Sequence, residues 1–238
     1  MAPRKAESAQ LTRGQIVAAA MRLIDRDGLE AQSMRALGAE LGVDPSTVYY
    51  YVPGKAALYD LVVDEVLSAV DLSVDDPSAS FEDRVVAAGL EYRRALLLHP
   101  RAVPLVAVRS LRTPAQLAVI EGLSHIFFDA GFSAAEALLA MDTCGLTIVG
   151  MTGMHAARLA ASGLQEPATA SADSAGGLAA DRYPNVTRML AAAGTLDESL
   201  EFERAMRALA RGLLALHLEG ALGNRTPDGA GAHAPGGE

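Results

Sequence analysis

The chain has 238 residues but only one cysteine, Cys144, and no tryptophan. A single thiol excludes a disulfide framework within the chain and a metal site made of paired cysteines. The first ten residues are polar and no apolar segment follows them, so we expect no secretory signal peptide. No run approaches the roughly 18 consecutive apolar residues that a membrane-spanning helix needs. These absences predict a cytoplasmic protein that does not enter a membrane.

The motifs of common enzyme classes are also missing. The five histidines are scattered, none forms an HExxH pair, and there is no GxSxG elbow, Walker loop or GxGxxG turn. Cys144 lies in an apolar stretch, which favours a small buried side chain over the alternative of a reactive thiol. We therefore predict that the chain is not an enzyme and has no catalytic residue, metal ion or cofactor.

The net charge of −9 by itself disfavours a nucleic-acid partner. The acidity is uneven, however, because residues 1–60 hold seven basic and seven acidic side chains and are neutral overall. DNA binding would then depend on where individual cations lie. Arg4 and Lys5 form a basic arm that could reach DNA or, equally, take no part in binding.

Residues 33–55 are the most informative part of the sequence. Ser33 can cap a helix that ends at Gly42, and Asp44 with Pro45 can open a second helix after a tight turn. Val48 is the one aliphatic side chain that would pack the second helix against the core. This layout predicts a helix-turn-helix, whose second helix can enter the major groove of DNA.

Hydroxyl and aromatic side chains dominate the second helix. Tyr49, Tyr50 and Tyr51 cannot all be buried, because consecutive helical residues point about 100° apart. The alternative is that Tyr49 or Tyr51 packs inward and the others are merely solvated. Lys55, just before a helix that begins at Ala56, can hold a phosphate or simply be solvated. The candidate DNA-binding residues are Ser33, Arg35, Pro45, Ser46, Thr47, Tyr49, Tyr50, Tyr51 and Lys55.

The rest of the chain reads as helical, so the predicted fold class is all-α. Caps and breaks predict helices from Thr12 to Gly28 and over 58–70, 81–98, 102–109, 114–127, 134–162, 185–193 and 198–219. We expect three parts: a three-helix DNA-binding domain with its connecting helix (1–70), a helical effector-binding and dimerisation domain (71–222) and a disordered tail (223–238). A linker at 71–80 and a mobile loop at 163–182 complete the prediction.

Two helices carry apolar seams with spacings of three and four residues, which suit either self-association or the core of one chain. One seam contains Phe202, Met206, Leu209, Leu213 and Leu216. The other contains Ala137, Met141, Cys144, Ile148, Met151 and His155. We favour a homodimer, because a helix-turn-helix of this size commonly reads two half-sites.

The chain resembles the tetracycline-repressor (TetR) family of bacterial transcription regulators. The resemblance is strongest at 11–20, 23–24, 27–28, 34–38, 48–52 and 55–58, and weaker at 92–97, 99–100, 130–133 and 136–138. It implies a homodimeric repressor of a palindromic operator on double-stranded DNA, with a four-helix bundle between subunits, released by a small apolar effector. The positions that match its effector pocket, each of which could equally be core, are Tyr92, Ile120, Leu123, Leu138, Met141 and Gly145.

The chain departs from tetracycline repressors where they hold a drug-bound magnesium ion. Residues 106–112 contain no histidine, and Met154 stands near the position of the acidic partner. The resemblance therefore does not extend to a magnesium–tetracycline ligand. Arg109 and Arg112 could meet an acidic ligand or lie on the surface. A constitutive DNA-binding regulator without an effector, or an activator, is the alternative function.

Overall fold

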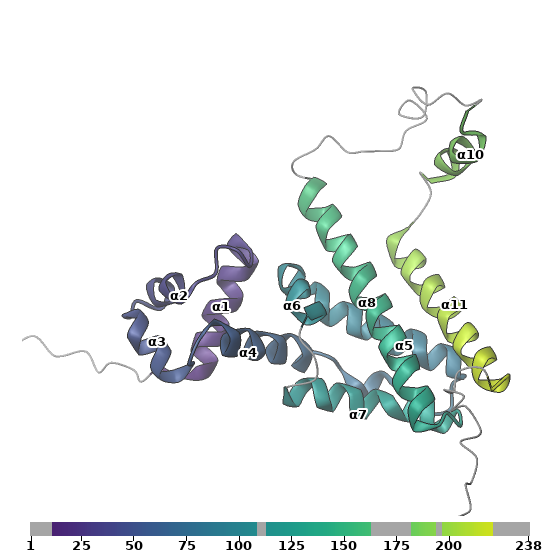
Figure 1. The fold of residues 1–238 in the computed structure, drawn as a ribbon, viewed down its shortest axis with the longest axis horizontal. Helices are drawn as coiled ribbons and strands as arrows, with labels where there is room; N and C mark the ends of the chain where they lie inside the picture. The colour runs from purple at the N-terminus through teal and green to yellow at the C-terminus, as the bar shows by residue number, and fades with distance from the viewer. Residues whose placement is uncertain (1–10, 109–112, 163–181, 194–196, 221–238) are drawn as a thin grey trace, which may run out of the picture.

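The computed structural model describes residues 11–108, 113–162, 182–193 and 197–220, and every regular element within these ranges is a helix. The molecule has two parts (Figure 1). A small head holds the first three helices, and α4 leads from it into a larger helical body. The predicted all-α fold class is confirmed.

The head consists of α1 (Arg13–Asp27), α2 (Met34–Leu41), α3 (Pro45–Tyr51) and the start of α4 (Lys55–Ser68). The Thr12 hydroxyl accepts the Gln15 N–H at 3.2 Å, and the Gln15 side chain accepts the Thr12 N–H at 2.9 Å. This reciprocal capping fixes where α1 begins. The helices close over a shared apolar core that includes Ile16, Leu37 and Val48, each 0% exposed.

The body is built from longer helices. They are η1 (Leu72–Val74), α5 (Phe81–Leu97), η2 (Pro100–Ala102), α6 (Val103–Val108), α7 (Pro114–Asp129), α8 (Ala134–Ser162), α10 (Pro184–Ala193) and α11 (Glu198–Leu218). The last helix packs along α5 and α8, while α7 packs against α4. The α10 helix stands apart from the other helices (Figure 1).

Several predicted boundaries shift slightly in the structure. Lys55 is the first residue of α4 rather than the residue before it, and the predicted 71–80 linker contains the short turn η1. The predicted helix at 102–109 is a 3-10 turn followed by α6. Arg4, Lys5, Arg109, Arg112, most of the 163–182 loop and the 223–238 tail lie outside the described residues.

Of the two alternatives for the apolar seams, the core of one chain applies to most of their side chains. Phe202, Met206 and Leu213 on α11 are at most 5% exposed, because this face of the helix covers α5. On α8, Ala137, Cys144 and Ile148 lie in the same core. Periodicity correctly marked a buried face but could not tell which chain buries it. A contact with a second copy would use the exposed surface that these helices retain, which includes Leu216, 42% exposed.

The α8 helix also corrects the expectation about membrane-spanning segments. Residues Ala134–Ala160 are long and apolar enough, by length and composition alone, to cross a membrane. Counting unbroken apolar runs missed this window because polar residues such as Asp142 and Thr143 interrupt it. A single such helix is weak evidence for a span, since the core helix of a globular body passes the same test. Part of its apolar surface lies in the core, and Leu139 and Leu146 remain exposed.

Candidate DNA-binding surface and ligand cavity

Local capping chemistry sets the angle between α2 and α3. The Ser33 hydroxyl accepts the Ala36 N–H at 3.1 Å, and the Asp44 carboxylate accepts the Ser46 N–H at 2.9 Å. Gly42 ends α2 with a φ of 67°, a left-handed conformation that glycine adopts without strain. The predicted helix-turn-helix is thus present with its caps at the predicted residues.

Gly38 is a contributor to the turn that sequence reasoning missed. A Cβ atom at this position would lie 2.9 Å from the Val43 carbonyl oxygen and 3.2 Å from the Pro45 nitrogen. Only glycine allows the backbone of the turn to approach α2 so closely. A glycine inside a predicted helix was the available signal.

Most of the predicted base-reading side chains are exposed on α3. Val48 is 0% exposed, whereas Tyr49 is 50% and Tyr50 is 85% exposed. Ser46 and Thr47 are also exposed, and Pro45 is half-buried at the start of the helix. This arrangement leaves one side of α3 open for a groove of DNA.

Tyr51 differs from the other two tyrosines. It is half-buried, packs against the head core, and its ring meets the Tyr50 ring edge-on at 5.2 Å between centroids. The alternative that one tyrosine packs inward therefore applies in part to Tyr51. A contact between the Tyr51 hydroxyl and a DNA phosphate remains a prediction.

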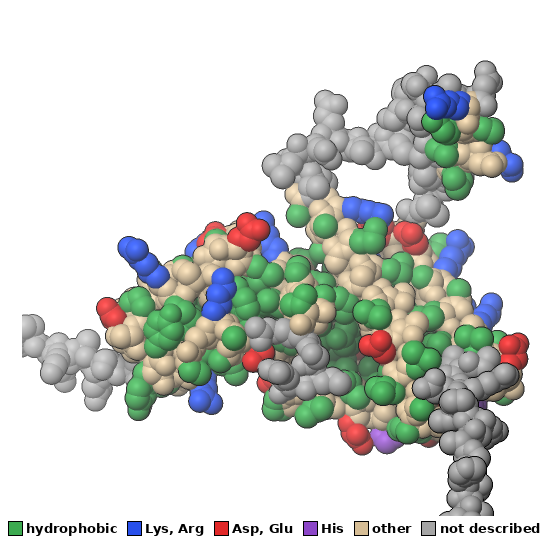
Figure 2. All heavy atoms as spheres, viewed as in Figure 1, with side chains coloured by type: hydrophobic (Ala, Val, Ile, Leu, Met, Phe, Trp, Pro, Cys, Tyr) green, Lys and Arg blue, Asp and Glu red, His purple; other side chains and the backbone are tan. Residues whose placement is uncertain are grey.

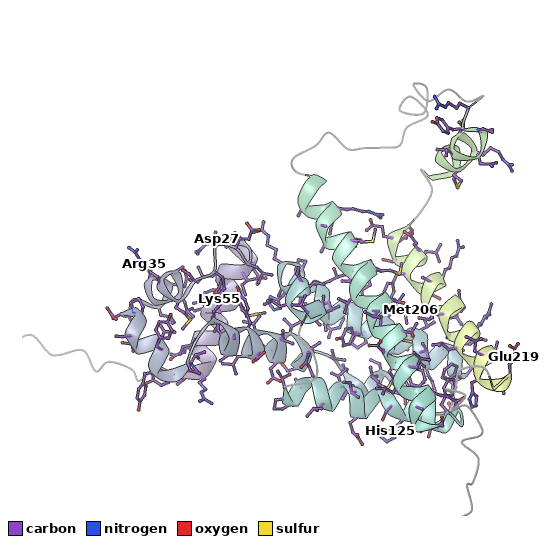
Figure 3. The ribbon with its side chains drawn as sticks, viewed as in Figure 1. Asp27, Arg35, Lys55, His125, Met206 and Glu219 are labelled. Carbon is purple, nitrogen blue, oxygen red and sulfur yellow. The ribbon has the colours of Figure 1, made fainter. Side chains whose placement is uncertain are left out.

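Positive side chains flank this surface. Arg35 projects from α2 away from the head (Figure 3), and Ser33 is exposed at the start of the same helix. Lys55 is exposed in the first turn of α4, with its Nζ 5.3 Å from the centre of the Tyr59 ring. The N-terminal end of a helix carries partial positive charge, so Lys55 and the N–H groups beside it suit a phosphate.

The body encloses an apolar cavity of about 780 Å³. Hydrophobic side chains line a recess between α6, α7 and α8 (Figure 2). All six residues predicted to contact an effector lie on its wall: Tyr92, Ile120, Leu123, Leu138, Met141 and Gly145. A cavity of this size and apolar lining suits a drug-sized molecule.

Few polar groups reach the cavity wall. The polar residues on the wall include Gln116, Asp142 and Tyr92, and burial raises the pKa of Tyr92 to about 12. Cys144 also lines the cavity, and burial raises the pKa of its thiol to about 12, which keeps it neutral and weakly reactive. Among the described residues, no three His, Cys, Asp or Glu side chains come together as a metal site.

The cavity wall is directly connected to the head, which sequence reasoning did not anticipate. Leu67 of α4 and Val103 of α6 both line the cavity. Next to α6, the His99 Nδ1 lies 2.8 Å from the Asp25 carboxylate, and Arg101 donates to the Arg26 carbonyl at 2.5 Å. A change in the position of α6 would therefore reach α1 of the head through polar contacts.

A helix-turn-helix head on a helical body with an apolar cavity defines the class of one-component DNA-binding regulators. Two family models match the chain. "Bacterial regulatory proteins, tetR family" matches residues 16–62, and "Tetracyclin repressor-like, C-terminal domain" matches residues 74–217. The chain belongs to the tetR family of bacterial regulatory proteins, a family of transcription regulators rather than enzymes.

Individual relatives agree with this assignment. An HTH-type transcriptional regulator of Saccharopolyspora erythraea is 36% identical over 59% of this chain and 59% of its own length. The class E tetracycline repressor of Escherichia coli is 29% identical over 57% of this chain and 64% of its own length. The chain thus spans less than two thirds of these relatives.

A solved structure extends the likeness to nearly the whole fold. ActR of Streptomyces coelicolor, in its apo form, matches with a TM-score of 0.77 and 25% identity over 90% of this chain and 99% of its own. ActR in complex with actinorhodin matches with the same TM-score, identity and coverage.

Proposed function

We propose that the protein is a ligand-responsive transcription regulator that binds a palindromic operator as a homodimer in the cytoplasm. Residues 1–70 would read DNA, and residues 71–222 would bind the effector and form the dimer. One observation carries the proposal: α3 is held by a single buried valine, Val48, while its polar and aromatic side chains face solvent. Two adjacent exposed aromatic rings, Tyr49 and Tyr50, together with exposed hydroxyls on one short helix suit a surface that a partner covers.

In the proposed complex, α3 lies in the major groove. Ser46, Thr47, Tyr49 and Tyr50 would contact base edges, while Arg35, Tyr51 and Lys55 would hold phosphates. Ser33 and Pro45 would support these contacts by fixing the starts of α2 and α3. Two heads would read half-sites one helical turn apart, roughly 34 Å.

The cavity would be the effector site. A small, largely apolar molecule there would shift α6 relative to α4 and, through His99 and Arg101, reposition α1. Release of DNA requires that the effector bind more tightly to the conformer whose heads no longer match the operator spacing. Repression with release by ligand is favoured because the named relatives include tetracycline repressors and because ActR has been solved with actinorhodin.

A dimer contact through the free faces of α8 and α11 completes the proposal. Leu139 is 49% exposed on α8, and Thr143 beside it turns its hydroxyl back to the Leu139 carbonyl at 2.7 Å. Gly212 on α11 has open space around the position of a Cβ atom. Small and apolar residues on the two helices allow a close four-helix contact with a second copy.

The experiment is a gel shift with the full-length protein and the DNA upstream of its own gene and of neighbouring genes. A panel of hydrophobic compounds is then added to the bound complex. We expect a specific shift that one compound abolishes. Thr47→Ala and Tyr49→Ala should each weaken operator binding by about 1–3 kcal/mol. Tyr183→Ala, at an exposed tyrosine outside the head, is the matched control.

Normal operator binding by both α3 variants would contradict the DNA-reading role of α3. A shift that no compound affects, together with no compound entering the cavity, would favour the alternative of a constitutive regulator. A compound that strengthens the shift would instead indicate a ligand-dependent DNA binder, whether activator or corepressor-type repressor.

A further inference from the structure

A second, much smaller cavity of about 110 Å³ lies between α5, α8 and the start of α11. Its wall carries several charged side chains, whereas Asp142 is the one Asp, Glu, Lys or Arg among the described residues that line the large cavity. It carries charged or titratable side chains from all three helices: Arg93, His155, Arg158, Glu198 and Glu201. Met154 lines both cavities, so the small one adjoins the large one at this side chain.

Arg93 is the unusual member of this wall. It is only 7% exposed, and its Nε has no hydrogen-bond partner. Among the described residues its one acceptor is the Glu198 carbonyl, 3.4 Å from Nη1. The Phe202 ring lies 4.7 Å from the guanidinium carbon and covers one face of the group. The Nε–H is therefore a buried donor without the acceptor that a buried polar group needs.

The neighbouring carboxylates do not neutralise Arg93. The Glu198 carboxylate contacts Nδ1 of His155 and lies 3.8 Å from Nη1 of Arg158. Within the described part of the chain, no carboxylate oxygen forms an ion pair with Arg93, and Glu201 is exposed. A buried cation without a counter-charge is costly, and an anion that accepts from its unpaired Nε–H would remove that cost.

We propose that this small cavity binds the carboxylate of an amphipathic effector whose apolar body fills the large cavity. The Nε–H and Nη2–H of Arg93 form the parallel pair of donors that a carboxylate accepts at both oxygens. Since one water occupies about 30 Å³ in the liquid, the cavity of about 110 Å³ has the volume of roughly three to four waters, which is enough for a carboxylate group. The inference rests on the proposed function, in which the large cavity is the effector site, and adds the chemical class of the effector: an aryl or alkyl carboxylic acid.

The test compares two probes that differ only in charge. The full-length protein is titrated with 4-(2-naphthyl)butyrate and with the corresponding neutral amide, and naphthyl fluorescence reports binding in a chain without tryptophan. We expect the wild type to bind the acid about tenfold more tightly than the amide, as suits one charge-assisted bidentate contact. Arg93→Met should weaken the acid about tenfold and leave the amide within about twofold.

The matched control is Arg211→Met, at an exposed arginine that lines neither cavity, which should keep the preference for the acid. Equal wild-type affinities for acid and amide would overturn the inference, and would agree with Glu201 turning inward to pair with Arg93. A preference for the acid that survives Arg93→Met would also overturn it. The wild-type comparison needs no variant, so it decides the matter even if Arg93→Met does not fold.

The same titration separates this inference from the proposed function. If the amide binds and the acid binds no better, the large cavity is a ligand site and only the carboxylate subsite fails. If neither probe binds, both the effector cavity and its carboxylate subsite are contradicted.

Discussion

Gly38→Ala tests whether the close approach of the turn to α2 sets the recognition angle. In an open helix this exchange stabilises by about 1 kcal/mol, because alanine has the better helix propensity. Here the new Cβ would lie 2.9 Å from the Val43 carbonyl oxygen and 3.3 Å from the Pro45 Cα. These are backbone atoms, so the turn itself must move.

Overpacking of this kind costs about 1–3 kcal/mol, which cancels or exceeds the gain in propensity. We therefore expect no gain and a net loss of up to about 2 kcal/mol in the free energy of unfolding, or a fall of up to roughly 8 °C in the melting temperature. Movement of the turn also tilts α3, so operator affinity should fall by more than the loss of stability alone would explain. Thermal unfolding followed by circular dichroism and a gel shift with excess folded protein measure the two effects.

Gly14→Ala is the matched control for this prediction. Gly14 lies in the first turn of α1, and a Cβ atom there would meet no atom within 4 Å. The control should be neutral or slightly more stable and should bind operator normally. A Gly38→Ala protein as stable as the Gly14→Ala protein, with unchanged operator affinity, would refute the argument.

Four further results are expected. Lys55→Met should weaken operator binding at every sequence and reduce the slope of log affinity against log salt by about 1, measured by titration at several salt concentrations. Gly145→Phe should fill the large cavity and abolish the response to the effector while operator binding persists in a gel shift. His99→Ala should leave effector affinity unchanged but reduce the effect of the effector on operator affinity, since its contact with Asp25 links α1 to the body. Glu136→Gln should make stability less dependent on pH between about 4.5 and 2, because the Ser133 N–H and hydroxyl and then His217 lower the pKa of Glu136 from 4.5 to about 2.

The direction in which Glu136 changes stability with pH follows from the linkage between proton binding and folding. A carboxyl whose pKa is lower in the folded than in the unfolded protein stabilises the fold above its unfolded pKa and loses that contribution as the pH falls through the folded value. Acid titrations of stability for wild type and variant compare the two slopes. Parallel curves over this range would contradict the role given to Glu136. An unchanged salt slope for Lys55→Met would contradict its phosphate contact, and a full effector response in Gly145→Phe would contradict the large cavity as the effector site.

Local chemistry made the head predictable from the sequence. Ser33, Gly42 and Asp44 act within a few residues of themselves, so their capping roles follow from residue type and spacing. The exposure of Tyr50 followed from the same helix geometry. The contact at Gly38 did not, because it depends on how closely α2 and the turn approach in space.

The body shows where sequence reasoning stops. The periodicity of α8 and α11 indicated buried faces, but Met206 packs against Gly89 of α5 in the same chain and not against a second copy. Figure 3 shows Met206 among α5, α8 and α11. Whether a group of apolar side chains packs solidly or leaves a cavity depends on how several helices fit together. The residues that line the cavity could therefore be predicted only from the family resemblance. No pattern in the sequence marked Arg93 as a buried cation with an unpaired Nε–H.

Two copies of α3 are proposed to read a palindrome. Selection of bound duplexes from a random-sequence pool, with the full-length protein, tests this whatever the sequence of the operator. We expect enrichment of an inverted repeat whose half-sites lie about one helical turn apart, and loss of that enrichment in the Tyr49→Ala protein. Recovery of no common sequence, or of the same sequence by wild type and variant with equal enrichment, would contradict it.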